Sequence, residues 1–143
     1  MAIEEGKKAP AFTLSDAKGK KHKLSDYAGK DVILYFYPRD DTPGCTKEAC
    51  GFRDLQKKIQ REGAVVLGVS PDGPESHAKF AKKYKLPFPL LCDPDKRYGK
   101  KTTGVIRSTV WIGPDGKVKK HWKRVAKAAD HPDKVLEALE ADA

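Results

Sequence analysis

Two cysteines, Cys45 and Cys50, lie five residues apart in a segment that has the character of a helix start. Thr42 is a good N-cap residue and Pro43 occupies the favoured first helical position, so Cys45 is expected in the first turn of the helix. There, unpaired backbone N–H groups and the positive end of the helix dipole favour a thiolate over a thiol. Because the thiolate attacks electrophiles, the segment predicts an activated nucleophile and cysteine redox chemistry.

The predicted helix extends from residue 43 to about residue 62, and its apolar stripe includes Cys45 but not Cys50. Helix positions five apart differ by roughly 140° around the axis and ~7.5 Å along it, so the two Cα atoms are more than ~8 Å apart. A disulfide requires Cα atoms within about 7 Å. The two sulfurs can therefore join only if the first turns unwind, and Gly44 and Gly51 lower the cost of unwinding.

Two unbroken apolar runs, residues 32–37 and 65–69, bracket this helix and are typical of central parallel strands buried on both faces. Strand, helix and strand in this order form a βαβ unit, which a second amphipathic helix follows. The remaining predicted elements are that second helix over about 74–84, short strands around 12–14 and 21–24, a hairpin of 108–112 and 117–122 around the turn 113–116, and a last helix over about 131–141.

This order of elements predicts an α/β chain with a thioredoxin-like fold, in which a central mixed sheet is flanked by helices and preceded by an N-terminal β extension. The length of 143 residues suits a single domain, 1–143. No apolar run approaches the ~20 residues of a membrane span, and the N-terminal residues lack the apolar core of a secretory signal. We therefore expect a cytoplasmic protein with no membrane partner.

The net charge of +9 raises the alternative of a basic nucleic-acid-binding protein. The lysines are spread along the chain, which favours a solvated surface over a dedicated site, and no recognised nucleic-acid motif accompanies them. We expect no specific nucleic-acid partner, although such a surface would attract an acidic protein. The alternative predicts salt-sensitive retention on DNA that survives replacement of Cys45.

The chain contains three cysteines and four histidines. An odd cysteine count in a chain of this length favours a redox or metal role over a structural disulfide framework. The histidines lack zinc-like spacing, and Cys-x4-Cys has no matching second ligand pair, so a metal site is not expected. Cys92 follows two leucines in a predicted strand and is interpreted as a small buried hydrophobe.

Several segments together resemble a known family. The active-site segments are Pro38-x-x-x-Thr42-x-x-Cys45, Glu48, Cys50-Gly-Phe-Arg53 and Arg107-Ser-Thr109. Further matches at 68–72, 76–80, 86–91 and the hairpin extend the similarity over nearly the whole chain. By these residues the sequence resembles the peroxiredoxins, and within them the bacterioferritin-comigratory-protein or PrxQ group. It departs from relatives in a short connection between Tyr98 and Arg107.

The resemblance implies a thiol peroxidase that reduces hydrogen peroxide and small organic hydroperoxides. Cys45 would be the peroxidatic cysteine, which attacks the O–O bond and becomes a sulfenic acid, and Cys50 the resolving cysteine, which condenses with it as an intramolecular disulfide. Thioredoxin or a similar dithiol would recycle the enzyme, without a metal or organic cofactor, and a monomer is expected. A thioredoxin-type thiol–disulfide oxidoreductase is the alternative, but it would normally carry Cys-x-x-Cys.

The residues around the cysteine fit this chemistry. Thr42 is expected to direct its hydroxyl to the thiolate or peroxide, and Arg107 to hold the sulfur and the peroxide oxygens. Pro38 would shield the sulfur from water, and Glu48 would orient Arg107 through a charge-assisted hydrogen bond. Taken singly, each has a structural alternative, as a helix cap, surface arginine, strand terminator or solvated carboxylate. Their joint occurrence around a capped cysteine favours the catalytic interpretation.

Overall fold

The computed structural model describes residues 3–94 and 107–142, and the strands within them form one seven-stranded mixed sheet. The strands are β1 (Thr13–Asp16), β2 (Lys21–Lys23), β3 (Asp31–Phe36), β4 (Ala64–Ser70), β5 (Leu90–Cys92), β6 (Ser108–Ile112) and β7 (Val118–Trp122). Their order is β2-β1-β5-β4-β3-β6-β7, with β3, β4 and β5 parallel and β6 antiparallel to β3. The predicted thioredoxin-like α/β fold, with its N-terminal β extension, is confirmed.

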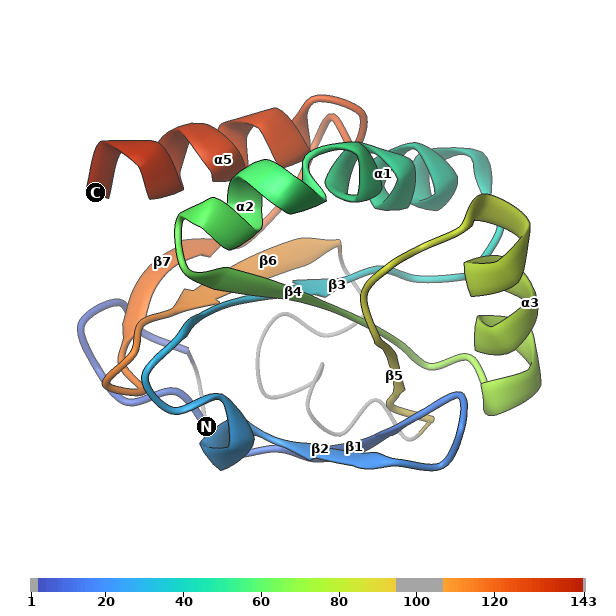
Figure 1. Cartoon of the computed structure of the whole chain (residues 1–143), viewed down its shortest axis with the longest axis horizontal. Coiled ribbons are helices and arrows are strands. Elements are labelled where there is room, and N and C mark those ends of the chain that lie inside the picture. Colours follow the sequence, from blue (N-terminus) through green and yellow to red (C-terminus); the bar gives the residue numbers. More distant parts are fainter. Residues whose placement is uncertain (1–2, 95–106, 143) are drawn as a thin grey trace.

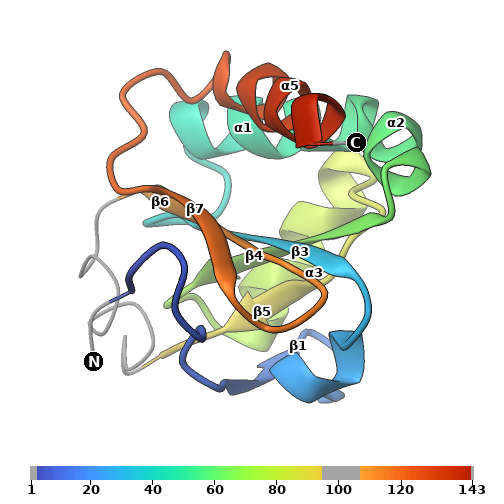
Figure 2. The same ribbon diagram turned by 90° about the vertical axis from the view of Figure 1, so that its left-hand side faces the viewer.

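The helices cover one face of the sheet and the N-terminal segment the other. The helices are α1 (Pro43–Asp54), α2 (Gln56–Arg61), α3 (Pro74–Tyr84) and α5 (His131–Asp142), with a 3-10 turn at Leu24–Tyr27. Figures 1 and 2 show α1, α2 and α5 side by side above the central strands β3 and β4, with β1 below these strands. Side chains of β3 alternate between two cores: Ile33 and Tyr35 pack under the helices, whereas Val32 and Leu34 pack toward the N-terminal segment.

The single helix predicted over 43–62 is wrong in one respect, because the segment forms two helices. Leu55 adopts φ −97° and ψ 3° between them, in the bridge region of backbone space. Gly51 of α1 faces Pro132 of α5, while α2 buries Ile59 completely. The break lets each helix bury its own apolar side. None of the described helices is long and apolar enough to cross a membrane.

Candidate active site

Cys45 lies in the first turn of α1, where the sequence places it, and its side chain is buried. Thr42 has extended backbone angles at the N-cap position, and the Thr46 N–H donates to its carbonyl oxygen at 2.8 Å. The cysteine belongs to the core cluster that contains Tyr35 and Tyr37. The sulfur therefore combines the thiolate-favouring N-terminus of a helix with surroundings that exclude bulk water.

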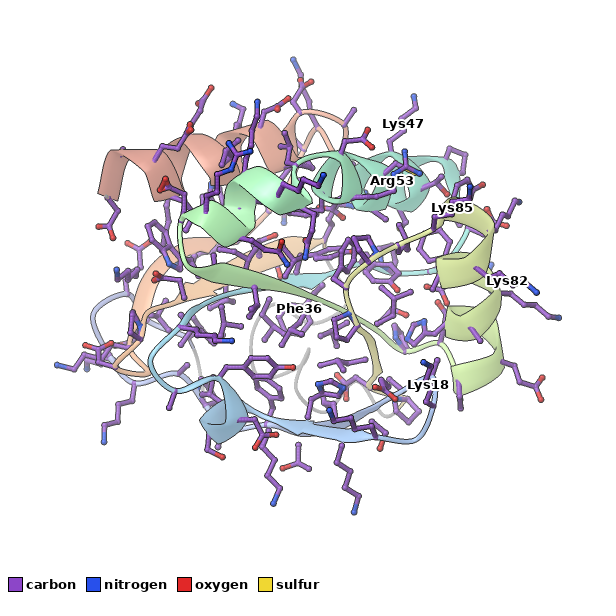
Figure 3. The ribbon with its side chains drawn as sticks, in the orientation of Figure 1. Lys18, Phe36, Lys47, Arg53, Lys82 and Lys85 are labelled. Carbon is purple, nitrogen blue, oxygen red and sulfur yellow. The ribbon has the colours of Figure 1, made fainter. Side chains whose placement is uncertain are left out.

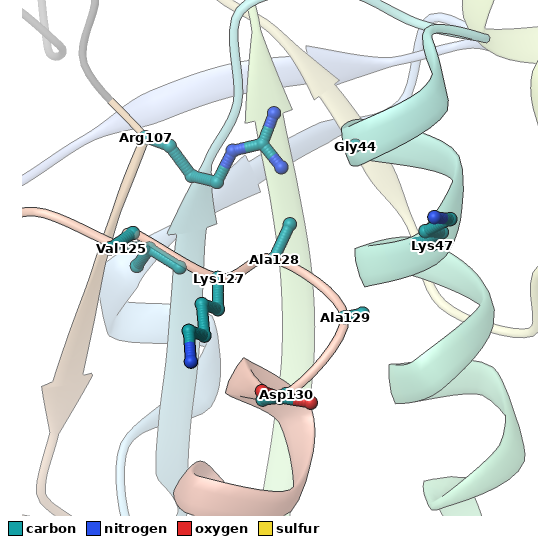
Figure 4. Close-up of a pocket in the computed structure, with 9 residues that line it drawn as sticks. Gly44, Lys47, Arg107, Val125, Lys127, Ala128, Ala129 and Asp130 are labelled. Carbon is teal, nitrogen blue, oxygen red and sulfur yellow. The ribbon is translucent and has the colours of Figure 1, made fainter.

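Arg107 brings a cation to this sulfur, since its Nη2 lies 3.1 Å from Cys45 Sγ. Strand register explains the contact. Ser108, the first residue of β6, pairs with Phe36, the last residue of β3. Arg107 therefore lies beside the carboxyl end of β3, from which the chain continues to α1. Gly44 leaves room for the guanidinium, because a Cβ there would lie 3.1 Å from Nη2. Figure 4 shows the arginine side chain directed at this turn.

Glu48 is fully buried one turn after Cys45, and burial raises the pKa of its carboxyl from the ordinary 4.5 to about 8, against a lowering by Arg107. Its Oε1 lies 3.7 Å from Arg107 Nη1, beyond hydrogen-bond distance, and neither oxygen has a hydrogen-bond partner among the described residues. The structure thus brings the two residues together without the expected charge-assisted hydrogen bond. At neutral pH the contact joins a cation to an uncharged acid, because desolvation keeps the proton on the carboxyl.

Thr42 and Pro38 are less directly engaged. The Thr42 hydroxyl donates to the carbonyl oxygen of Arg39 at 3.0 Å and makes no capping bond to the helix. A role toward the sulfur or a peroxide therefore requires this hydroxyl to turn away from Arg39. Pro38 follows β3 and is exposed, while core packing already buries Cys45. Its action as a shield stays a prediction.

Cys50 is half-buried on α1, outside the buried side of that helix, and all three cysteines are free. The intact turns between Cys45 and Cys50 hold the two sulfurs apart, as helical geometry requires. Cys92 ends β5 and is half-buried, so its interpretation as a buried hydrophobe is only partly correct. Burial raises the pKa of the Cys92 thiol, which disfavours its thiolate.

The loop before α1 is fixed by a buried polar cluster that the sequence analysis did not identify. Asp40 accepts hydrogen bonds from the Tyr37 hydroxyl at 2.6 Å and the Ser76 hydroxyl at 2.7 Å. His77 Nδ1 lies 2.6 Å from the same carboxylate, and its Nε2 lies 3.0 Å from the Leu91 carbonyl oxygen. The imidazole of His77 thus bridges the Asp40 carboxyl and the Leu91 carbonyl oxygen through its two ring nitrogens. The Ser-His dipeptide is visible in the sequence, but its distant partner is not.

A second buried histidine that the sequence analysis missed is His131, at the start of α5. Its Nε2 lies 2.7 Å from Thr109 Oγ1, and its ring packs edge-on against Phe52. Burial lowers the pKa of His131 to about 4, and the positive charge of Arg107 adds to this effect. The neutral ring therefore joins β6, α5 and α1 beside the cation of the site.

A pocket of about 540 Å³ opens beside Arg107, lined by Gly44 and Lys47 of α1 and by residues 125–130 before α5 (Figure 4). It offers a small reactant both apolar side chains and cations, among them Arg107, which contacts the buried sulfur. Within residues 3–94 and 107–142, no three His, Cys, Asp or Glu side chains are placed to hold a metal ion. The short connection from Tyr98 to Arg107 lies largely outside the described residues.

Proteins of known family are similar to this chain in sequence and in fold. The profile of the AhpC/TSA family matches residues 5–121. Peroxiredoxin Bcp of Bacillus subtilis is 45% identical over 152 residues, with 97% of this chain and 96% of the relative covered. A putative peroxiredoxin bcp of Coxiella burnetii is 48% identical over 138 residues, with 87% and 91% covered.

Solved structures agree. Peroxiredoxin Q of Xanthomonas campestris superposes with a TM-score of 0.87 at 37% identity, covering 91% of this chain and 90% of that one. Peroxidoxin BcpB of Mycobacterium tuberculosis superposes with a TM-score of 0.90 at 35% identity, covering 97% of both chains. The chain therefore belongs to the AhpC/TSA family, among its Bcp/PrxQ peroxiredoxins.

Proposed function

We propose that this chain is a thiol peroxidase that reduces hydrogen peroxide and small organic hydroperoxides through Cys45. The observation that carries the proposal is the 3.1 Å contact of Arg107 Nη2 with Cys45 Sγ in the first turn of α1. A solved relative from Xanthomonas campestris, a bacterioferritin comigratory protein, is described by its alkyl peroxide reduction activity. The pocket beside Arg107 has room for the organic group of such a substrate.

In the first step the Cys45 thiolate attacks one peroxide oxygen, forming an S–O bond and breaking the O–O bond. The sulfur becomes a sulfenic acid, and the departing oxygen takes up a proton and leaves as water or an alcohol. Arg107 can stabilise the negative charge as it moves from sulfur to that oxygen, because its planar guanidinium donates to both. Thr42 and Pro38 complete the proposed site as hydroxyl donor and shield.

In the second step the Cys50 thiolate attacks the sulfenic sulfur, so that an S–S bond forms and hydroxide leaves as water after protonation. This step requires the first turns of α1 to unwind. A dithiol protein such as thioredoxin then reduces the disulfide. We place this cycle in a cytoplasmic monomer, since the reducing cytosol suits a cysteine pair that opens and closes.

Neither alternative function gains support from the site. A thioredoxin-type oxidoreductase would expose a Cys-x-x-Cys pair, whereas Cys45 is buried and five residues from Cys50. For nucleic-acid binding, the basic side chains would have to gather on one face. Figure 3 instead shows Lys18, Lys47 and Lys82 pointing outward from different parts of the molecule.

The test combines two variants with mass mapping. Cys45→Ser should abolish peroxide consumption, whereas Cys50→Ser should permit one oxidation and let a sulfenic-acid probe label Cys45. After one equivalent of peroxide, the wild type should contain a Cys45–Cys50 bridge within one chain. Equal first-step rates in wild type and Cys45→Ser would refute the peroxidase proposal, and a bridge to Cys92 or between chains would refute the resolving role of Cys50.

A further inference from the structure

Glu48 is a buried titratable group on the helix that must unwind, and the proposed cycle assigns its proton no task. Glu48 lies between the two cysteines in the sequence, and its side chain is 0% exposed. Neither of its carboxyl oxygens has a hydrogen-bond partner among the described residues. A buried polar group without a partner costs free energy that is recovered when it reaches water. We propose that Glu48 controls the unwinding of α1, holding the helix folded while protonated and favouring the unwound helix once ionised.

The arrangement of charges around Arg107 supports this role. One guanidinium serves two acids, with Nη2 at 3.1 Å from Cys45 Sγ and Nη1 at 3.7 Å from Glu48 Oε1. The guanidinium donates to the sulfur through Nη2 and makes no hydrogen bond to the Glu48 carboxyl. Ionising Glu48 would therefore place a negative charge without a hydrogen bond in a buried site, so folded α1 retains the proton.

No other cation faces the carboxyl from the elements packed against α1 in the described structure. From β3, Tyr35 presents a hydroxyl that has no hydrogen-bond partner there, and burial followed by the charge of Glu48 raises its pKa. From α5, His131 is neutral because its pKa is lowered to about 4. On α1 itself, Cys50 is a free thiol. The folded helix therefore offers an ionised Glu48 only the shared guanidinium.

The direction of the pH effect follows from the two states of α1. In the folded helix the pKa of Glu48 is raised to about 8 by burial, whereas an unwound, hydrated segment returns it toward the ordinary 4.5. Between these values the folded form binds a proton that the unwound form has released. The opening constant of α1 should therefore rise by about tenfold per pH unit in this window, and be level on either side.

This inference rests on the proposed Cys45–Cys50 cycle, in which unwinding precedes the disulfide. Its test uses Cys45→Ser protein, which has no thiolate at position 45 and cannot react with peroxide. Hydrogen exchange of the amides of residues 46–52 is measured from pH 5 to 8 and corrected for intrinsic exchange. The opening constant should rise with pH in this protein and be level after Glu48→Gln, while Glu137→Gln on the exposed side of α5 leaves the rise intact.

An opening constant that does not change with pH in Cys45→Ser protein overturns the proposal, even if the Gln variant fails to fold. A rise of the opening constant with pH that persists after Glu48→Gln also overturns it. A second measurement uses the two-cysteine protein. Both proteins retain Cys50, so ionisation of its thiol contributes the same pH dependence to each. When the logarithm of the rate of disulfide formation is plotted against pH, the slope should therefore be about one unit smaller in Glu48→Gln than in wild type. Failure of the peroxidase proposal is seen separately, as absence of peroxide consumption by wild type.

Discussion

Asp40 and His77 meet at 2.6 Å in the interior and tie the loop before α1 to α3. The next residue, Asp41, adopts φ 56° and points the other way, accepting hydrogen bonds from Lys83 Nζ and the Tyr84 hydroxyl, each at 2.8 Å. The loop is thus held to α3 by one buried and one exposed contact. Because Thr42 follows directly, this attachment sets where α1 begins and where it presents Cys45.

Replacing His77 with Asn should therefore destabilise the protein and slow the first step of peroxide reduction. Loss of the imidazole removes a hydrogen bond from the buried Asp40 carboxyl, and a buried polar group left unsatisfied costs about 1–3 kcal/mol in the free energy of unfolding. Urea denaturation and stopped-flow oxidation measure the two effects. The control is Lys83→Gln, which removes only the exposed contact with Asp41 and should leave the urea midpoint nearly unchanged, because exposed ion pairs contribute little to stability. Equal losses in the two variants would contradict the assignment.

Gly44→Ala should impair the first step while leaving stability nearly unchanged. The added Cβ would lie 3.1 Å from Nη2 and 3.2 Å from Nη1 of Arg107, and the end of a flexible side chain gives way most easily. Removal of a comparable charge-stabilising donor costs enzymes about 10²–10³-fold in rate, so displacing the guanidinium should cost about tenfold or more. Gly73→Ala is the matched control, because a Cβ at this helix N-cap meets nothing within 4 Å. Similar rates for both alanine variants would count against the role of Arg107.

The features predicted from the sequence are those encoded locally. Thr42 and Pro43 mark a helix start, and the apolar runs in β3 and β4 mark buried strands, so the position of Cys45 follows from a short segment. The contact of Arg107 with the sulfur depends instead on the pairing of β6 with β3, which joins distant segments; the family resemblance supplied it. Tertiary packing also decides the break at Leu55 and the missing hydrogen bond of Glu48, and no local pattern encodes either.

Gly51→Ala should reduce stability although it raises helix propensity. A Cβ at position 51 would lie 2.7 Å from Cγ of Pro132, inside the packed contact of α1 with α5. Overpacking costs about 1–3 kcal/mol, and the gain of Ala over Gly in a helix is about 1 kcal/mol, so a net loss of about 1 kcal/mol is expected. Thermal or urea unfolding measures it. Adding Pro132→Ala should restore part of the loss, and a double variant no more stable than Gly51→Ala would show that this contact is not its cause.

His131 and Glu48 should make opposite contributions to the pH dependence of global stability. The pKa of His131 is lowered to about 4 in the folded protein, so between 4 and its ordinary 6.5 the unfolded chain binds more protons and stability rises with pH. The pKa of Glu48 is raised from 4.5 to about 8, so the folded protein binds more protons and stability falls with pH.

Each contribution amounts to about 1.4 kcal/mol per pH unit, and the two oppose each other where their windows overlap. From pH 4.5 to 6.5, wild-type stability should accordingly change little through these two groups. His131→Asn should leave the falling contribution of Glu48, and Glu48→Gln the rising contribution of His131, so urea denaturation across this range should give curves that diverge from wild type in opposite directions. Parallel curves for all three proteins would mean that neither side chain changes its proton affinity on folding, since a group that binds protons equally in both states cannot tilt the curve.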